Sequence, residues 1–231
     1  MTNAYEDAKA QLLDAALMHV PFDGWSEATF KAAIRDTAID EPFARTVCPR
    51  GAVDLAIAYH KAGDAAMVTA LAQADLSGMK FREKVAHAVK LRLQAIDDRE
   101  AVRRGTTLFA LPHLVADGSK LIWGTADAIW TALGDTSEDY NWYTKRLTLS
   151  GVYSATVLYW LGDDSADNQA TWEFLDRRIG DVMQFEKVKA QVHDNPLLKP
   201  FMAGPNWLLS QIKPPKRGAE MDMPGMMNPE S

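Results

Sequence analysis

Cysteine is almost absent from this sequence of 231 residues, which has a single one, Cys48. One thiol excludes an internal disulfide framework and any metal site built from several cysteines, and it fits a reducing compartment. Pro49 and Arg50 follow it directly. Although the arginine could lower the pKa of the thiol, we expect a buried or incidental thiol rather than a reactive one.

Long apolar runs and targeting signals are also lacking. No apolar run reaches the roughly 18 residues that a membrane-spanning helix needs, so any membrane contact is expected to be peripheral. The opening MTNAYEDAKAQLLDAAL has no basic region and no apolar core, and arginine first occurs at Arg35. Neither a secretory signal nor a mitochondrial transit peptide is therefore predicted, and we expect a cytoplasmic location.

The motifs of common catalytic and metal sites are missing as well. The five histidines form no His-Glu-x-x-His pattern and no Glu-x-x-His pair, and there is no glycine-rich phosphate loop and no Gly-x-Ser-x-Gly. We therefore name no catalytic residue, no metal ligand and no cofactor, and predict a protein that is not an enzyme. An enzyme with an unrecognised site is one alternative.

The sequence is dominated by a helical pattern of apolar residues. Between Phe81 and Ile96 the apolar positions recur at intervals of three and four residues. Similar patterns predict helices over about 120–133, over 137–162 and after residue 168. Alternating runs typical of strands are missing. With 47% hydrophobic residues the chain can form a core, and we predict an all-α fold.

The first fifty residues differ from the rest because they divide into three short predicted helices. Short helices followed by long ones are the layout of TetR-like regulators, in which a helix-turn-helix precedes a helical ligand-binding domain. However, residues 1–50 contain eight acidic and five basic residues, the wrong sign for neutralising phosphates. We interpret them as a degenerate helix-turn-helix-like unit and predict no nucleic-acid binding. A TetR-like transcriptional regulator with a hydrophobic effector is the alternative.

The C-terminal end combines basic and apolar side chains. Residues 195–219 contain four basic residues and no acidic one. This composition is typical of segments that dock on a membrane surface, although a terminal helix packed on the core would have the same composition. We predict a docking segment over 195–218 and a disordered tail over 219–231. The membrane-binding candidates are Phe201, Trp207, Leu208, Ile212 and Lys213.

The stretch DTSEDYNWYTKR, residues 135–146, places three aromatic residues among charges. If a helix begins near Ser137, four side chains share one of its faces. These are Asp139, Trp142, Tyr143 and Arg146. Tryptophan, tyrosine and arginine dominate the hot spots of protein interfaces, so this face is a candidate partner-binding site. Alternatively, the two aromatic side chains fill gaps in the core while Asp139 and Arg146 stay in solvent.

The string GDTSEDYNWYTKR resembles the signature of the coenzyme Q (ubiquinone) biosynthesis accessory family, lipid-binding proteins that assist the demethoxyubiquinone hydroxylase. GWSEATFKAAI, ALPHLVADG and ATWEFLDRRIGDVM are similar to further segments of the family. The resemblance covers roughly residues 10–185. It implies a TetR-like fold that no longer reads DNA, and a surface patch that binds the hydroxylase through the face named above. It also implies a terminal amphipathic helix, from which the proline-broken segment 195–218 departs.

The resemblance further implies a non-catalytic protein that binds isoprenoid quinone intermediates at the membrane and presents them to the hydroxylase. We expect the helical lipid-binding domain over residues 51–194. The lipid-binding candidates are Ile122, Trp123, Ile129, Trp130 and Leu158. TetR-like relatives usually dimerise through their last two helices, so we expect a homodimer through 147–162 and 170–183. The missing transit peptide fits a bacterial member on the inner face of the cytoplasmic membrane.

Overall fold

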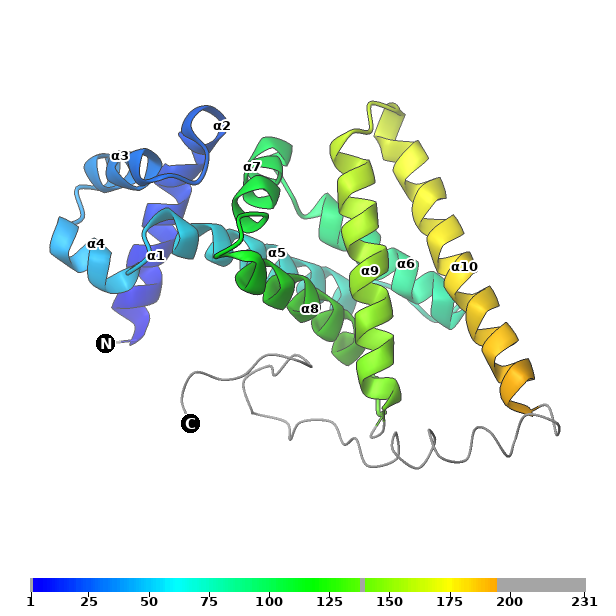
Figure 1. The fold of residues 1–231 in the computed structure, drawn as a ribbon. Helices are drawn as coiled ribbons and strands as arrows, with labels where there is room; N and C mark the ends of the chain where they lie inside the picture. Colours follow the sequence, from blue (N-terminus) through cyan, green and yellow to red (C-terminus); the bar gives the residue numbers. More distant parts are fainter. Residues whose placement is uncertain (1, 138–139, 195–231) are drawn as a thin grey trace. The chain divides into compact units, whose positions relative to one another are not determined.

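The computed structural model describes the backbone of residues 2–137 and 140–194, and the side chains of 4–137, 140–182 and 184. Within these residues the chain forms helices and no strand, which confirms the all-α prediction (Figure 1). The first helices are α1 (Thr2–Leu17), α2 (Val20–Asp23), α3 (Glu27–Thr37), α4 (Glu41–Val47) and α5 (Ala52–Gln73). They are followed by α6 (Phe81–Gln94), α7 (Arg99–Phe109), α8 (Val115–Ala132), α9 (Asn141–Leu161), the short 3-10 helix η1 (Ala166–Asn168) and α10 (Gln169–Asp194).

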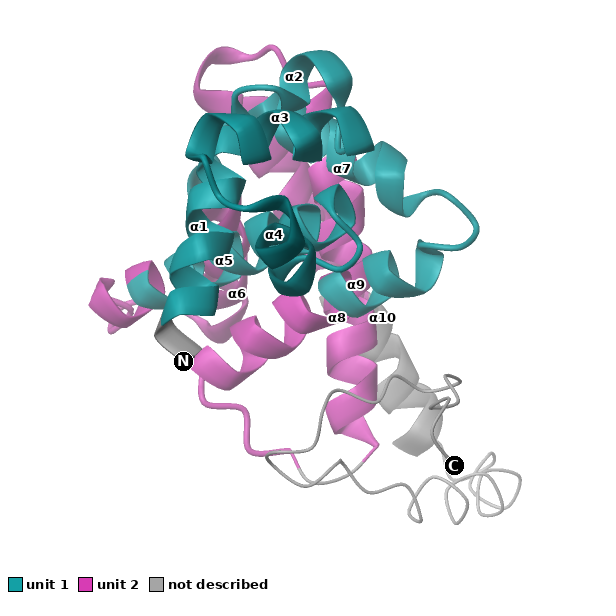
Figure 2. Ribbon diagram, turned by 90° about the vertical axis from the view of Figure 1, so that its left-hand side faces the viewer, with its two compact units in different colours: residues 1–69, 94–121 teal, residues 70–93, 122–231 magenta. Residues whose placement is uncertain are grey.

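The chain divides into two compact units (Figure 2). Unit 1 consists of residues 1–69 and 94–121, and unit 2 consists of residues 70–93 and 122–231. This division differs from the predicted boundary at residue 50, because α7 packs with the N-terminal helices. The indole N–H of Trp25, for example, donates a hydrogen bond to the Ala101 carbonyl at 3.0 Å.

The core of unit 1 is apolar and well filled. Phe30, Leu12 and Leu55 are fully buried in one cluster that joins α1, α3 and α5. Ser26 caps α3 by accepting a hydrogen bond from the backbone N–H of Thr29 at 3.2 Å. Cys48 is buried in the same cluster, which confirms the expected buried thiol, and this burial raises the pKa of the thiol to about 11.

In unit 2, α9 and α10 pack against each other after a tight connection. The Asp163 carboxylate accepts hydrogen bonds from the hydroxyl and the backbone N–H of Thr171, at 2.5 Å and 2.9 Å. These bonds and those from Ser165 hold the pKa of Asp163 well below its usual value. Along the helix pair, the Tyr159 and Phe174 rings stack with centroids 4.5 Å apart.

A helix that crosses a membrane must be both long and apolar. None of the described helices has both the length and the apolar character that a crossing requires.

Candidate functional site

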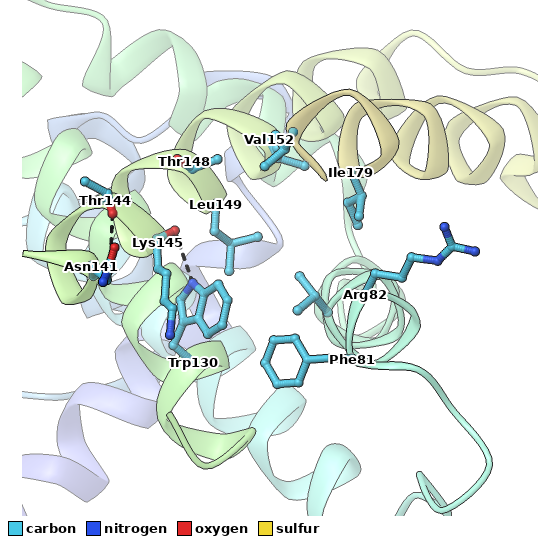
Figure 3. A pocket seen from close by; sticks show the side chains of 12 residues that line it. Phe81, Arg82, Trp130, Asn141, Thr144, Lys145, Thr148, Leu149, Val152 and Ile179 are labelled. Atoms are coloured by element: carbon cyan, nitrogen blue, oxygen red, sulfur yellow. Dashed lines mark hydrogen bonds between the residues drawn. The ribbon is translucent and has the colours of Figure 1, made fainter. Parts of the chain in front are cut away.

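Unit 2 encloses an apolar cavity of about 240 Å³ between α6, α8, α9 and α10 (Figure 3). Its aliphatic lining comes from Val85, Leu149, Val152, Ile179 and Val182. Its aromatic lining comes from Phe81 and Trp130. Its polar lining comes from Arg82, Asn141, Thr144, Lys145 and Thr148. No carboxylate lines the cavity within the described part of the chain, so it suits a neutral or acceptor-bearing apolar ligand.

Two rings form one wall of the cavity. The Phe81 and Trp130 rings stack with their centroids 5.4 Å apart and an interplanar angle of 25°. The Trp130 indole N–H donates a hydrogen bond to the backbone carbonyl of Lys145 at 3.2 Å, which fixes the ring against α9. The Lys145 ammonium lies 5.2 Å from the centroid of the same ring. The wall therefore joins α6, α8 and α9.

Behind the cavity wall, Arg146 joins α9 to α8. Its guanidinium bonds to Asp127 at 2.5 Å and to Asp135 at 3.0 Å, and it donates a further hydrogen bond to the Trp142 carbonyl at 3.1 Å. Only 2% of Arg146 is exposed. Such a buried cation is stable only when its charge is compensated, and the two carboxylates supply that compensation.

Asp135 connects this ion pair to the cavity lining. Its carboxylate also accepts hydrogen bonds from the Lys145 ammonium at 2.9 Å and the Ser137 hydroxyl at 2.8 Å. Burial alone would raise the pKa of Asp135, but the bonds from Lys145, Ser137 and Arg146 outweigh it and lower the pKa to about 2. Asp135 is therefore ionised at neutral pH.

An aromatic cluster lies on the side of α9 that faces α8. It consists of Trp123, Trp142 and Tyr143, with the Trp142 and Tyr143 centroids 4.8 Å apart and the Trp123 and Trp142 centroids 5.9 Å apart. The Arg146 guanidinium stacks over the Trp142 ring at 3.9 Å. Trp123 is buried, and among the described residues its indole N–H has no hydrogen-bond partner.

The predicted partner-binding face is only partly formed as expected. Trp142 and Tyr143 lie together and are half-buried, whereas Asp139 lies outside the described residues. The alternative interpretation expected Arg146 in solvent, and that expectation is wrong because Asp127 and Asp135 pair with it in the interior. The Arg146 guanidinium stacks over the Trp142 ring.

Of the five predicted lipid-binding residues, only Trp130 lines the cavity. Ile129 and Trp123 are buried away from it, Ile122 is half-buried, and Leu158 is 60% exposed. The aliphatic and aromatic lining from α6, α9 and α10 was missed. In the sequence, this lining corresponds to apolar residues at helical spacing, Phe81 with Val85 and Ile179 with Val182. The same spacing had served to predict the helices.

Several predicted sites are not tested by these contacts. The membrane-binding candidates Phe201, Trp207, Leu208, Ile212 and Lys213 lie outside the described residues. The two segments expected to form a dimer correspond to α9 and the first half of α10. Within the described part of the chain, no three His, Cys, Asp or Glu side chains are grouped so that they could hold a metal ion.

Comparison with known proteins relates the chain to one family. Residues 115–186 match the COQ9 family model. The probable ubiquinone biosynthesis protein coq9 of Dictyostelium discoideum is 31% identical over 81% of this chain and 64% of its own length. The COQ9 ubiquinone biosynthesis proteins of Bos taurus and Homo sapiens are 28% and 27% identical, each over 81% of this chain and 61% of their own length. The family resemblance drawn from the sequence is thereby confirmed.

Comparison with solved structures gives the fold. A TetR transcriptional regulator from Nitrosomonas europaea superposes with a TM-score of 0.61 over 74% of this chain and 95% of that chain. The two sequences are 18% identical, so the similarity extends to the fold alone. It confirms the predicted TetR-like architecture.

The expected location is contradicted by the same relatives. The proteins from Dictyostelium discoideum, Bos taurus, Homo sapiens and Drosophila melanogaster are all named mitochondrial, not bacterial and cytoplasmic. Our expectation used the absence of a transit peptide near residue 1. Because the chain spans less than two thirds of the relatives it matches, that absence is not informative about location.

Proposed function

We propose, on the premise that the chain belongs to the COQ9 family of ubiquinone biosynthesis proteins, that it is a non-catalytic accessory protein. It binds an isoprenoid quinone intermediate in the cavity of unit 2 and presents it at a membrane surface to the demethoxyubiquinone hydroxylase. The observation that supports this most is the cavity itself, which is apolar, lies among α6, α8, α9 and α10, and has no acidic residue in its lining within the described part of the chain.

The size of the cavity limits what part of such a ligand it can hold. Pockets that enclose a whole drug-sized ligand measure about 300–1,000 Å³, and this cavity of about 240 Å³ is smaller. It therefore takes one ring or a few isoprene units of a longer lipid, while the rest of the lipid extends outside. Asn141, Thr144 and Thr148 supply polar groups for an oxygen-bearing head group.

The direct test is mass spectrometry of the lipid that copurifies with the protein, compared with a variant in which the cavity is filled. Val152→Trp places a large ring in the lining and should remove the copurified isoprenoid lipid. Val115→Trp makes the same substitution at an exposed valine that does not line the cavity, and it is the matched control. If both variants retain the lipid equally, or if no isoprenoid lipid copurifies with the unaltered chain, the proposal fails.

Presentation to the hydroxylase is proposed to use Trp142 and Tyr143, together with Asp139. Half-buried aromatic side chains that are fixed by neighbours lose little entropy on binding, as is typical of interface hot spots. Arg146 supports this face from the interior by holding Trp142.

Dimerisation and membrane docking belong to the same proposal. Leu147 and Leu158 are the most exposed apolar side chains of α9, which supports a homodimer through α9 and α10. Leu147→Glu combined with Leu158→Glu should then produce a monomer in light scattering, without loss of helicity. Deleting residues 195–231 should markedly weaken flotation with liposomes if the segment 195–218 docks on membranes, and unchanged flotation would contradict that docking.

A TetR-like regulator is the second candidate, because the structural neighbour is named as one. The geometry of α4 argues against DNA binding. Arg45 is the only basic residue of α4, and it pairs with Glu27 and with Glu41. A helix without a free cation cannot neutralise phosphates. Tight, specific binding to genomic DNA fragments in a gel-shift assay would favour the regulator over the accessory protein.

A further inference from the structure

We infer that the first residues of α6 dock the mouth of the cavity on a lipid surface that contains anionic head groups. This inference rests on the proposed function, since it concerns how a lipid reaches the same cavity. It assigns a docking site to residues 80–84, here called the α6 rim. The α6 rim is separate from the predicted docking segment at 195–218.

The α6 rim forms an exposed part of the cavity lining. Phe81 and Arg82 both line the cavity, and both are exposed, Phe81 with 49% of its surface in solvent. The Phe81 ring points toward Trp130, on which it stacks (Figure 3). An exposed ring that continues the cavity wall gives a lipid chain an apolar path from the surface into the interior.

The α6 rim is basic in a chain whose net charge is −6. Lys80, Arg82 and Lys84 flank Phe81. Among the described residues the ammonium groups of Lys80 and Lys84 form no ion pair, and the guanidinium of Arg82 reaches Glu83 only at 3.9 Å. The Glu83 carboxylate also accepts a hydrogen bond from the backbone N–H of Lys80 at 2.9 Å, so it serves the start of the helix.

The acidic residues next to the cavity lining already have partners. Asp135 bonds to Lys145 at 2.9 Å, and Asp181 on α10 pairs with Arg178 at 2.8 Å. The bases of the α6 rim are therefore available for anions from outside the chain.

An exposed aromatic side chain flanked by Lys80 and Lys84, whose ammonium groups form no ion pair among the described residues, fits an anionic lipid surface. The ring can enter the interface between head groups and acyl chains, while the bases are attracted to the head groups. The continuity between Phe81 and an apolar cavity favours a lipid surface over a protein partner, because the occupant of the surface can then also occupy the cavity. The attraction should weaken as salt is raised.

A dye beside the α6 rim tests this inference in the full chain. Gly78→Cys is suitable because a Cβ at this position meets no atom within 4 Å, and because the native Cys48 is buried. An environment-sensitive dye on this thiol should shift to the blue with vesicles of phosphatidylcholine and phosphatidylglycerol. It should shift much less with phosphatidylcholine alone or at high salt. The same dye on Phe22→Cys, at a side chain that is 81% exposed, is the control and should not shift.

Substitutions then locate the contact. Phe81→Ser, or the triple change Lys80→Glu, Arg82→Glu and Lys84→Glu, should raise the vesicle concentration for a half-maximal shift about tenfold or more. The matched control makes the same charge change at the exposed residues Lys31, Lys61 and Lys120 and should have little effect.

The outcomes separate this inference from the proposed function. If the dye at position 78 does not shift while isoprenoid lipid still copurifies, the inference fails and the lipid-binding function stands. If the control triple abolishes the shift as strongly as the rim triple, general charge is responsible and the inference also fails. If the dye shifts as expected but no isoprenoid lipid copurifies, the α6 rim still binds membranes and the proposed function fails.

Discussion

Around Phe30 in unit 1 the interior is apolar, whereas around Arg146 in unit 2 it contains charged groups. Unit 1 keeps its ion pairs, such as Glu27 with Arg45, near the surface. In unit 2, Arg92, Arg146 and Asp163 are buried, and the side chain of Asp135 is only 3% exposed. Unit 2 also contains the cavity and, within the described part of the chain, two buried polar atoms without hydrogen-bond partners, on Trp123 and Ser150.

The interior of unit 1 is what a stable fold requires, whereas the interior of unit 2 is not. Apolar packing stabilises a fold without the desolvation cost of charged groups, and an unfilled cavity lowers stability further. Unit 2 has both a cavity and buried charges. Departures of this kind from efficient packing tend to occur at functional sites. The contrast therefore supports the proposal that a ligand binds in unit 2, with unit 1 mainly a stable support.

The largest effect should come from Phe30→Ala in the core of unit 1. Removing this fully buried ring should cost about 4 kcal/mol of unfolding free energy, from lost burial and the cavity left behind. Chemical denaturation followed by circular dichroism measures it, with the exposed Phe22→Ala as control. Lipid bound per folded molecule should not change. If Phe30→Ala lost lipid while keeping its full stability, the proposed division of roles between the units would be wrong.

Arg146→Ala should cause the next largest loss of unfolding free energy. It leaves the carboxylates of Asp127 and Asp135 without their buried partner, which should cost about 3 kcal/mol of unfolding free energy. Lys145→Ala, at a more exposed side chain, should cost no more than about 1 kcal/mol. Denaturation curves of the two variants give the comparison. Equal losses would mean that burial of Arg146 has little energetic consequence.

Trp142→Lys separates partner binding from stability. We expect binding to the hydroxylase to weaken by on the order of 2 kcal/mol, roughly thirtyfold in Kd. Loss of the contacts with Arg146 and Trp123 should cost about 1 kcal/mol in stability. Titration of the purified protein against the hydroxylase, beside a melting curve, measures both. A variant that unfolds would assign Trp142 to the core, and one that binds normally would remove it from the interface.

The last prediction concerns how the free energy of unfolding depends on pH. Because the folded state lowers the pKa of Asp135 from 3.8 to about 2, the ionised carboxylate stabilises the fold above its unfolded pKa. This contribution, about 2 kcal/mol, should be largely lost as the pH falls from about 5 to about 2. Urea unfolding across this range should show a flatter profile for Asp135→Asn. An identical profile would mean that other carboxylates account for the loss in acid.

The helical fold follows from the spacing of apolar residues, but the ends of the helices do not. The helix expected from near Ser137 begins at Asn141 instead. The hydroxyl of Ser137 bonds to the Asp135 carboxylate at 2.8 Å, so it forms part of a turn and not a helix cap. Local hydrogen bonds of this kind compete with helix formation. Which of the two forms here depends on the bonds that Lys145 and Arg146 make to Asp135 in the folded chain.

The candidate site was less predictable, because helix periodicity does not tell which neighbour a face meets. Trp130 lines the cavity, yet Ile129, about 100° round the same helix, is buried elsewhere. For Arg146 the compensating carboxylates lie 19 and 11 residues earlier in the chain. Their pairing depends on how α8 and α9 meet, which spacing within one helix cannot show.

Helix α9 carries two sets of side chains in the same two turns. Asn141, Thr144 and Lys145 line the cavity, while Trp142 and Arg146 face α8. Each residue advances the helix by about 100°, so inserting or deleting a single residue after position 143 would rotate Thr144, Lys145 and Arg146 away from Asn141 and Trp142 and would break both sets at once. Over evolutionary time either set can change residue by residue, but the length of this segment is constrained by both at once.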